Sequence, residues 1–447
     1  SPTANFNNIL MIIHLATIQR MIPAIVDVTA AYLHANIEGT VYMRINSDIG
    51  KILKGEQKPI IVRLNKCIYG LKQSGRKWFE LLKSTFMNMQ FRNTNYDACI
   101  FYRSTVNKSS RNNINNCWII IYVDDIMIFA DSESTKREVI QKLEQAFGQI
   151  TIQFGPEFSF LGLQITFKNG ETLINQKAYS EKITSTTTVS LKEPVTPHRH
   201  DFKPICPNCE QAGHGNYKSD VMKLMYLATR TRPDIIYNTA VLATKTNPYK
   251  QDYADVQRIM RYIKATRHEG LRFTDSKIKI SMYCDASFNV HEDRKSQSGY
   301  IIFLNDDSSP ILFKSKKQSS LAQSSTEAEI IALFEGVRHL TLLVNLLQEL
   351  GIDVNKPIPV WEDNMAVIEL ISSDKILKGN ARFIDRKYFA TRDNVLNGDI
   401  CLHYVDTADQ IADCLTKAIS GQRFQTFKKI LHGTYKHSAE QIEMDDK

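Results

Sequence analysis

The run Tyr122-Val123-Asp124-Asp125 constrains this chain more than any other segment. It interrupts a strongly apolar stretch, with residues 118–121 before it and 126–129 after it. Because β-branched and aromatic residues on both sides favour strands, we expect residues 117–130 to form a hairpin with the polar run at its tip. Ionised carboxylates are costly to bury unless a cation or hydrogen bonds compensate them. The adjacent aspartates therefore predict a divalent-metal site.

Length and composition bound the architecture and the setting of the chain. At 447 residues, with 43% hydrophobic and 23% charged residues, it is long enough for two to four globular domains. We find no run of about 18 uninterrupted apolar residues and no signal segment at the start, so we expect a soluble intracellular protein without membrane association. Eight scattered cysteines fit a reducing compartment, and a start at Ser1 instead of Met suggests a processed product or a fragment. The formal net charge of +8 fits a polyanionic partner, although solvated surface lysines also account for it.

Hydrophobic periodicity predicts alternating helices and strands, which indicates an α+β or α/β protein. Before residue 170 the predicted elements are a helix at 8–22, a strand ending at Asp27, a helix at 74–90, the hairpin, a helix at 134–147 and a strand at 158–165. Residues 184–218 are rich in Thr, Pro, His, Cys and Gly and are predicted to be an irregular linker before a helical region at 219–266. A new domain is predicted to begin near residue 277. Its predicted elements are strands at 278–285, 299–304, 310–314, 358–362 and 400–405, and helices at 325–350, 382–396 and 408–419.

Three aspartates form the first candidate site. Asp27 ends its predicted strand and lies 97 residues before Asp124. Neither neighbour of Asp27 in the sequence is an acid. Two divalent ions about 4 Å apart can activate a 3′-hydroxyl and stabilise a leaving pyrophosphate, and carboxylates from more than one strand are needed to hold them. The alternative, ordinary turn or surface aspartates, is disfavoured by the apolar strands on both sides of Asp124 and Asp125.

Four acids form the second candidate site: Asp285, Glu329, Asp363 and Asp413. They come from a strand, a long helix, the end of another strand and a late helix, and such a set can bind two metals that flank a scissile phosphate with water as nucleophile. Taken singly, each acid is more typical of a solvated surface.

Capping patterns separate the acids of the second site from their neighbours. Ser324-x-x-Glu327 fits a capping box, so Glu327 is expected to turn back to the cap and leave Glu329 for the cleft. In the same way, Thr407-x-x-Gln410 is expected to cap the final helix with Asp409 in its first turn, which leaves Asp413 as the ligand.

Several runs in the first 235 residues occur in a characteristic order. They are Val26-Asp27-Val28-Thr29-Ala30-Ala31-Tyr32-Leu33, Val41-Tyr42-Met43, Cys67-Ile68-Tyr69-Gly70-Leu71-Lys72-Gln73, Tyr122-Val123-Asp124-Asp125, Phe160-Leu161-Gly162 and Thr231-Arg232-Pro233-Asp234-Ile235. In this order and spacing they resemble the reverse transcriptases of copia-type LTR retrotransposons.

The resemblance implies roles for individual residues of the first half. Asp27, Asp124 and Asp125 are implied to be metal ligands, assisted by the backbone carbonyl of Val28. The implied substrate-binding residues are Tyr32 as an aromatic gate against a 2′-hydroxyl, Gln73 at the template, Tyr122 in the hairpin, and Phe160, Leu161 and Gly162 as the primer-gripping turn.

The last third carries its own ordered runs. They are Tyr283-Cys284-Asp285-Ala286-Ser287, Lys295-Ser296-Gln297-Ser298-Gly299-Tyr300, Lys314-Ser315-Lys316-Lys317-Gln318, Ser324-Ser325-Thr326-Glu327-Ala328-Glu329, Glu362-Asp363-Asn364 and Ile411-Ala412-Asp413. These resemble ribonuclease H and imply that Asp285, Glu329, Asp363 and Asp413 are both the catalytic residues and the metal ligands. In many ribonuclease H sites a mobile histidine precedes the last aspartate. Ala408 lies near that place here.

Together the resemblances imply a multidomain α+β and α/β protein. The implied domains are a palm-type polymerase domain with truncated fingers at 1–170, a helical thumb and connection at 171–275 containing the linker 184–218, an α/β ribonuclease H-like domain at 276–425 and a C-terminal tail at 426–447. The implied function is RNA- and DNA-directed DNA polymerisation coupled to cleavage of RNA–DNA hybrids, with two Mg²⁺ or Mn²⁺ ions per active site.

The implied partners are an RNA template, a DNA primer, an RNA–DNA hybrid and dNTPs, with homo-oligomers or other Pol and Gag products as further partners. The implied location is the cytoplasm, in a virus-like particle, with access to the nucleus. Only 26 residues precede Asp27, where relatives carry basic fingers residues, so the alternative is a polymerase-defective remnant that retains ribonuclease H activity or nucleic-acid binding. An integrase is disfavoured because its acids do not lie in a Tyr-Val-Asp-Asp hairpin.

One further pattern concerns a structural metal. Cys206, Cys209 and His214 imitate three ligands of a zinc knuckle, but Ser219 lies where the fourth is expected. Since a structural zinc site needs four ligands, an ordinary loop is the favoured interpretation.

Overall fold

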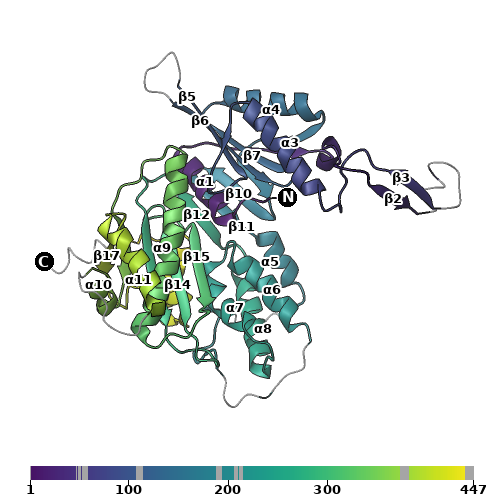
Figure 1. The fold of residues 1–447 in the computed structure, drawn as a ribbon. Helices are drawn as coiled ribbons and strands as arrows, with labels where there is room; N and C mark the ends of the chain where they lie inside the picture. Colours follow the sequence, from purple (N-terminus) through teal and green to yellow (C-terminus); the bar gives the residue numbers. More distant parts are fainter. Residues whose placement is uncertain are drawn as a thin grey trace. The chain divides into compact units, whose positions relative to one another are not determined.

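The computed structural model describes residues 2–46, 48, 52, 59–106, 114–187, 194–205, 210, 215–372 and 382–437, without the side chains of 105, 106, 114, 115 and 382–386. The chain divides into two compact units (Figure 1). Unit 1 comprises Ser1–Ile9 and Met21–Phe158, and unit 2 comprises Leu10–Arg20 and Ser159–Lys447.

Unit 1 is built on a six-stranded antiparallel sheet with the order β4-β5-β6-β7-β1-β8. The central hairpin is apolar on both faces, and residues 118–121 and 126–129 are fully buried, which explains the continuous apolar runs of the sequence. Two helices, α3 and α4, bury Trp78 and Leu143. A separate hairpin of β2 and β3 extends away from this sheet (Figure 1). The elements are β1 (Ala24–Val28), η1 (Ala31–His34), β2 (Tyr42–Ile45), β3 (Ile60–Arg63), α3 (Ser74–Asn88), β4 (Arg92–Asn93), β5 (Ile100–Val106), β6 (Ile114–Tyr122), β7 (Asp125–Ala130), α4 (Glu133–Phe147) and β8 (Ile150–Gln153).

The first part of unit 2 combines a four-stranded sheet of order β12-β11-β10-β9 with a group of helices. Most of α1 also belongs to this unit: the His14 ring stacks on Phe273 with centroids 4.5 Å apart, and the hydroxyls of Thr17 and Thr172 are 2.6 Å apart. The elements are α1 (Phe6–Ile18), β9 (Glu157–Phe160), β10 (Leu163–Lys168), β11 (Glu171–Asn175), α5 (Lys177–Ile183), α6 (Tyr217–Ala228), η2 (Pro233–Ile235), α7 (Ile236–Ala243), α8 (Lys250–Ala265) and β12 (Gly270–Thr274).

The second part of unit 2 is a five-stranded mixed sheet of order β15-β14-β13-β16-β17. Strands β13, β14 and β15 pair antiparallel, whereas β16 and β17 are parallel to β13. The long helix α9 packs against β13 and β14. The elements are β13 (Ser281–Ser287), β14 (Gln297–Phe303), β15 (Leu312–Lys317), α9 (Ser325–Glu349), β16 (Ile358–Glu362), α10 (Met365–Ser372), α11 (Arg382–Leu396), β17 (Ile400–Tyr404), η3 (Ile411–Leu415) and α12 (Gly421–Leu431).

Helix α9 has the length and apolar composition of a membrane-spanning helix. In this fold its apolar residues, among them Ile330, Leu333, Val337 and Leu340, are buried. A helix buried in the core of an α/β domain has the same composition, because it is apolar over most of its surface.

Most predicted elements occur within a few residues of their expected bounds, but three predictions need correction. The strand expected at 158–165 is two strands, because Leu161 and Gly162 adopt positive φ angles of 52° and 75° and turn the chain. The helix expected at 408–419 is only the short 3-10 helix η3, and Thr407-x-x-Gln410 is not its capping box. Gln410 is itself the N-cap, and its side chain accepts a hydrogen bond from the Ala412 amide.

The compact units also divide the chain differently from the predicted domains. The boundary falls at Phe158 instead of residue 170, and the predicted connection and last domain share one unit. Helix α12 crosses the predicted start of the tail and buries Phe424, Phe427 and Ile430, so the packed chain continues past residue 425.

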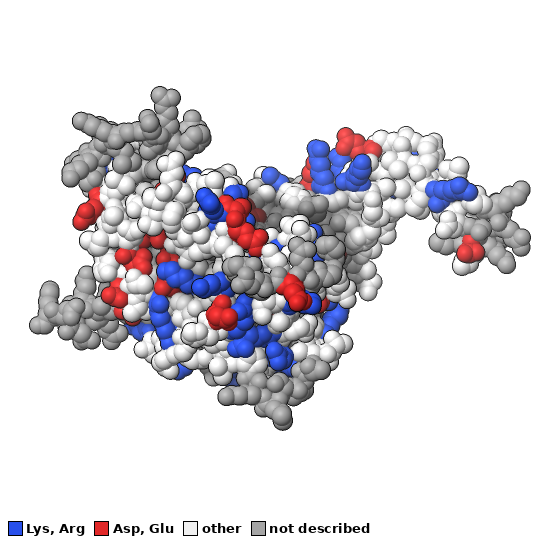
Figure 2. All heavy atoms as spheres, turned by 90° about the horizontal axis from the view of Figure 1, so that it is seen from below, with Lys and Arg blue, Asp and Glu red and all other residues white. Residues whose placement is uncertain are grey.

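Charge is mixed on the surface. Figure 2 shows one face of the molecule on which Lys and Arg side chains lie beside Asp and Glu side chains. The net charge of +8 therefore does not by itself define a nucleic-acid-binding face.

Candidate active sites

The three aspartates of the first candidate site meet at one end of the hairpin in unit 1. Strand β1 pairs with β7 so that Asp27 lies opposite Asp125. Asp124 lies in the turn between β6 and β7, where Val123 has a φ of 62°. This left-handed conformation is strained for a β-branched residue, and the indole N–H of Trp78 supports it by donating a 2.7 Å hydrogen bond to the Val123 carbonyl.

The carboxylates of this first set influence one another electrostatically. Partial burial, and then the charge of Asp124, raises the pKa of Asp27. The pKa of Asp125 is raised by burial and by the charges of Asp124 and Asp27. Among the described residues, two groups of three acids have ligand atoms within 4.8 Å of one another, and neither group contains these aspartates. Unit 1 thus brings its three acids together more loosely than unit 2 does.

Tyr69 contributes to this site although it was not among the predicted site residues. Its hydroxyl donates a 2.8 Å hydrogen bond to Asp124 Oδ2, and its ring lies 4.2 Å from that of Tyr32. Burial and this hydrogen bond raise the pKa of Tyr69. The signal was present in the sequence, since Tyr69 belongs to the run that ends at Gln73.

The predicted substrate-binding residues lie in different surroundings. Tyr32 follows β1 on η1 and is half-buried, and Tyr122 pairs with Asp125 across the hairpin. The side-chain amide of Gln73 exchanges two hydrogen bonds with the backbone of Glu38, at 2.9 and 3.1 Å. Val28 is buried at the end of β1.

The predicted primer-gripping turn belongs to unit 2. Phe160 is buried, and the carbonyl of Leu161 accepts a 3.1 Å hydrogen bond from the Tyr226 hydroxyl. A side chain at Gly162 would lie 3.1 Å from the same hydroxyl. Helix α6 therefore fixes the conformation of this turn.

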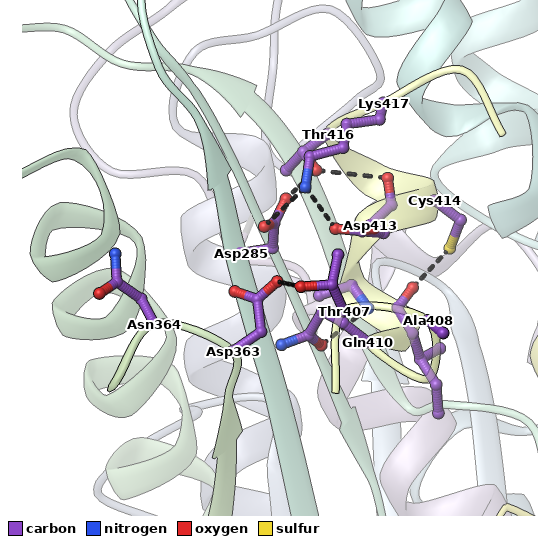
Figure 3. A network of polar contacts seen from close by, with 12 residues as sticks. Asp285, Asp363, Asn364, Thr407, Ala408, Gln410, Asp413, Cys414, Thr416 and Lys417 are labelled. Atoms are coloured by element: carbon purple, nitrogen blue, oxygen red, sulfur yellow. Dashed lines mark hydrogen bonds and ion pairs between the residues drawn. The ribbon is translucent and has the colours of Figure 1, made fainter. Parts of the chain in front are cut away.

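The second candidate site gathers acids from four elements of unit 2. Asp285 lies on β13, Asp363 directly follows β16, and Asp413 lies on η3, and one ligand oxygen from each lies within 4.8 Å of the others. Figure 3 shows the three carboxylates pointing toward one another, whereas Asn364 points away. The side chain of Gln410 positions η3 by donating a 2.9 Å hydrogen bond to the Cys284 carbonyl on β13.

A second group shares Asp363 with the first. Glu329 on α9, Glu362 at the end of β16 and Asp363 also have ligand oxygens within 4.8 Å of one another. Glu362 was not predicted as a site residue. A signal for it is that an acid ends the otherwise apolar run of β16, where burial demands a partner.

Cationic and hydroxyl groups surround the first of these two groups. Lys417 Nζ lies 2.7 Å from Asp413 Oδ1 and 3.2 Å from Asp285 Oδ1 (Figure 3). The guanidinium group of Arg423 lies 2.6 Å from Asp413 Oδ2. The Thr416 hydroxyl donates a hydrogen bond to Asp285. The Thr407 hydroxyl, expected to cap a helix, instead donates a 2.8 Å hydrogen bond to Asp363.

Burial and mutual repulsion shift Asp285, Glu329 and Glu362 toward their neutral forms. Burial, followed by the charge of Asp413, raises the pKa of Asp285 to about 7. Burial and the charge of Asp285 raise the pKa of Glu362 to about 8, against the lowering effect of the Cys284 thiol. The pKa of Glu329 is raised well above its usual range by burial and by Glu362. Although burial opposes its charge, Asp285 and Asp413 raise the pKa of Lys417.

Glu327 and Glu329 lie in different surroundings. The Ser324 hydroxyl accepts a 3.1 Å hydrogen bond from the Glu327 amide, and the Glu327 carboxylate accepts one from the Gln323 amide at 2.7 Å. Glu327 therefore closes the start of α9, and Glu329 is buried beside the other acids. The proposed zinc ligands Cys206, Cys209 and His214 lie outside the described residues.

Comparison with known proteins gives a consistent set of relatives. Residues 1–197 match the family described as reverse transcriptase (RNA-dependent DNA polymerase). The chain is 29% identical over 443 residues to the retrovirus-related Pol polyprotein from transposon TNT 1-94 of Nicotiana tabacum, covering 96% of this chain and 32% of that protein. It is 29% identical over 432 residues to the transposon Ty1-JR2 Gag-Pol polyprotein of Saccharomyces cerevisiae, covering 90% of this chain and 23% of that protein.

The chain thus spans about a third or less of these relatives. Among solved structures, a ribonuclease H1 isolated from compost aligns with 31% of the chain and 91% of its own length, at 15% identity and a TM-score of 0.24. A prototype foamy virus protease-reverse transcriptase aligns with 91% of the chain and 46% of its own length, at 11% identity and a TM-score of 0.23. Residues 1–197 are thus similar to reverse transcriptases, and most of the chain is similar to part of the Pol polyproteins of these retrotransposons.

Proposed function

We propose that the chain copies retrotransposon RNA into DNA and degrades the RNA strand of the resulting hybrid. The observation that carries this proposal is the presence of two separate acid clusters, one at the hairpin of unit 1 and one on the five-stranded sheet of unit 2. One cluster serves nucleotidyl transfer and the other serves hydrolysis. The proposed substrates are an RNA template, a DNA primer, dNTPs and an RNA–DNA hybrid.

In unit 1, Asp27, Asp124 and Asp125 would bind the divalent ions used in polymerisation, assisted by the backbone carbonyl of Val28. The register that sets Asp27 opposite Asp125 supports this assignment, because it joins carboxylates that are far apart in sequence. Tyr69 holds Asp124 through its hydroxyl and supports the ring of Tyr32, the proposed gate under the sugar of the incoming nucleotide.

Template and primer contacts are proposed for other residues of the polymerase. Gln73 fixes the backbone at Glu38 and so shapes the surface on which the template lies. Tyr122 flanks the acids in the hairpin, and Phe160, Leu161 and Gly162 form a turn at the primer. We propose that residues 1–170 carry the palm and partial fingers, 171–275 the thumb and connection with linker 184–218, and 276–425 the ribonuclease H.

In unit 2, Asp285, Glu329, Asp363 and Asp413 would bind the divalent ions used to cleave the RNA strand. The buried Glu329 Oε2 has no hydrogen-bond partner among the described residues, which fits an oxygen that binds a cation. All-oxygen ligand sets favour Mg²⁺ or Mn²⁺. When bound, two such ions supply the charge that activates the attacking oxygen and stabilises the leaving oxygen.

The residues around these acids have supporting roles. Lys417 and Arg423 balance the charge of Asp285 and Asp413, and Thr407 orients Asp363. Gln410 holds η3 against β13 so that Asp413 faces Asp285.

A second candidate function is ribonuclease H activity without polymerase activity. The tighter grouping of the acids in unit 2 than in unit 1 favours it. In either case we propose that the protein acts in a cytoplasmic virus-like particle with access to the nucleus, either as a homo-oligomer or with other Pol and Gag products.

Two assays on one preparation test the proposed function. Extension of a DNA primer on an RNA template reports the polymerase, and cleavage of a labelled RNA strand in a hybrid reports the nuclease, each with Mg²⁺ and with EDTA. We expect metal-dependent activity in both. Hybrid cleavage alone would support the second candidate, and absence of both activities would contradict the assignment.

A further inference from the structure

Glu362 is a carboxylate that the four-acid site of unit 2 does not require. It ends β16, its side chain is fully buried, and its ligand oxygen lies within 4.8 Å of those of Glu329 and Asp363. Burying a carboxylate next to two others is costly unless positive charge compensates it. The burial of Glu362 beside two other acids therefore requires a compensating interaction.

The partners of Glu362 are weak and neutral. Its two oxygens accept hydrogen bonds from the Asn364 amide and from the Cys284 thiol, each at 3.2 Å. Among the described residues no Lys, Arg or His forms an ion pair with Glu362, whereas Lys417 and Arg423 compensate Asp413 on the other side of the cluster. Glu329 and Glu362 are therefore the acids of the cluster that lack a cationic partner in the described part of the chain.

Glu329 provides an independent observation that points to a ligand. Its side chain is only 6% exposed, and its Oε2 atom is buried without a hydrogen-bond partner in the described part of the chain. A buried carboxylate oxygen without a hydrogen-bond donor destabilises the fold unless a cation lies beside it. The neighbouring oxygens belong to Glu362 and Asp363. In their ionised forms these carboxylates cannot donate a hydrogen bond to Glu329.

We propose that Glu362 is a fifth cation ligand, which together with Glu329 and Asp363 would bind one divalent metal ion, while the group of Asp285, Asp363 and Asp413 would hold a second. This inference rests on the proposed nuclease function of unit 2 and adds to it a ligand beyond the four acids. The bound species is a hard, oxygen-seeking cation such as Mg²⁺ or Mn²⁺.

Counting bound Mn²⁺ tests the proposal directly. The parent is the full chain carrying Asp27→Asn and Asp125→Asn, substitutions that remove two of the three candidate acids of unit 1. Electron paramagnetic resonance of free Mn²⁺ reports how much of the ion the protein binds. We expect two Mn²⁺ ions per parent chain. Adding Glu362→Gln is expected to weaken one of the two by at least about tenfold, as loss of a charged ligand should.

Two further variants locate the affected ion. Glu329→Gln is expected to weaken the same ion, so the combination with Glu362→Gln weakens it by less than the product of the two single effects. Glu335→Gln is the matched control, because Glu335 lies on the same helix but pairs with Lys316 at 3.4 Å, outside the cluster. It should leave both ions unchanged.

Thermal unfolding gives a second readout that does not depend on activity. In EDTA, Glu362→Gln replaces a buried carboxyl that its neighbours repel when it is ionised, and should not lower the melting temperature below that of the parent. The same Mn²⁺ concentration should then raise the melting temperature of the variant less than that of the parent, since stabilisation grows with the logarithm of ligand concentration over the dissociation constant.

The outcomes separate this proposal from the proposed function. If Glu362→Gln binds two Mn²⁺ ions with parental affinity and melts lower than the parent in EDTA, Glu362 is only a hydrogen-bond acceptor for Cys284 and Asn364, and the proposal is overturned while the nuclease stands. If the parent binds no Mn²⁺ and cleaves no hybrid, the proposed nuclease function fails and this inference fails with it.

Discussion

Lys417 is the residue that best explains how the acids of unit 2 coexist in the folded chain. Its ammonium group bridges Asp285 and Asp413, each of which is almost completely buried. A buried carboxylate that loses its only compensating charge destabilises a fold strongly, whereas an exposed pair contributes little. Lys417 is intermediate, because 40% of its side chain is exposed while its partners are buried.

Replacement of Lys417 by Met should therefore destabilise the protein when no divalent cation is present. We expect a loss of about 1 kcal/mol in the free energy of unfolding in EDTA, measured by urea denaturation and reduced for the exposure of the side chain. Mg²⁺ should recover part of the loss because it supplies the missing positive charge. Lys142→Met is the matched control, since Lys142 forms an exposed pair with Glu138. Equal stability of both variants in EDTA would refute a compensating role for Lys417.

His14 gives unit 2 a specific sensitivity to acid. Its ring is fully buried against Phe273, and burial lowers its pKa from 6.5 to about 3. The unfolded chain therefore binds a proton near pH 6.5 that the folded chain does not bind until about pH 3. The stabilising contribution is complete above pH 6.5 and is lost as the pH falls toward 3.

The variant His14→Gln should remove this dependence. Between pH 6.5 and 3, we expect its free energy of unfolding to fall less steeply than that of the native protein, by up to about 1.4 kcal/mol per pH unit. Chemical denaturation at a series of pH values measures the slope. The exposed His200→Gln should keep the native slope. An unchanged slope in His14→Gln would show that His14 does not titrate in this way.

At the scale of single elements, the hairpin of β6 and β7 depends on one bond from α3. The Trp78 indole N–H donates to the carbonyl of Val123, the residue with positive φ next to Asp124. Trp78→Phe removes this bond and about 1 kcal/mol of support for the turn. We expect primer extension to fall by about fivefold to tenfold while hybrid cleavage is retained.

A matched control exists for this substitution. Trp118 is equally buried on β6, but its indole nitrogen has no hydrogen-bond partner among the described residues. Trp118→Phe therefore reports the loss of volume without the loss of a hydrogen bond. If both variants lose primer extension equally, packing and not the bond to Val123 supports the turn.

Strand β14 and η3 approach so closely at Gly299 that no side chain fits. A Cβ atom there would lie 2.7 Å from Thr416 Cγ2 and 2.8 Å from Leu415 Cβ. Gly299→Ala should push η3, and with it Asp413, away from β13, at a cost of about 1 to 3 kcal/mol. We expect hybrid cleavage to fall with primer extension retained.

Gly336→Ala is the control for Gly299→Ala. The added methyl group at Gly336 in α9 meets mainly the flexible end of Met282, at 3.0 Å, and alanine favours the helix. Its effect on cleavage should be smaller. Equal loss in both variants would mean that tight packing in general, not the position of η3, controls Asp413.

Most of the correct predictions came from residue patterns within a single helix or hairpin. The apolar runs around Asp124 predicted the β6 and β7 hairpin, and Ser324 with Glu327 predicted the start of α9. The errors arose where a distant partner decides the local structure. Thr407 was expected to cap a helix but bonds Asp363, and Glu362 is buried beside Glu329 on a helix that precedes it by more than thirty residues. Neither contact follows from local spacing.

At the scale of the whole molecule, the two acid clusters belong to different units. Asp27 and Asp125 face each other within unit 1, and Asp285, Asp363 and Asp413 converge within unit 2. Alternation of helices and strands predicted this α+β and α/β character. It could not predict that residues 10–20, which include most of α1, join unit 2, because that depends on packing such as His14 on Phe273.

The central claim is that each cluster serves one activity. The most direct test assays Asp125→Asn and Asp363→Asn side by side for primer extension and for cleavage of the RNA strand of a hybrid, at equal folded protein concentration. We predict that Asp125→Asn loses primer extension by at least about a hundredfold and keeps hybrid cleavage, and that Asp363→Asn does the reverse. Loss of both activities in either variant, or of neither in both, would contradict two separate active sites.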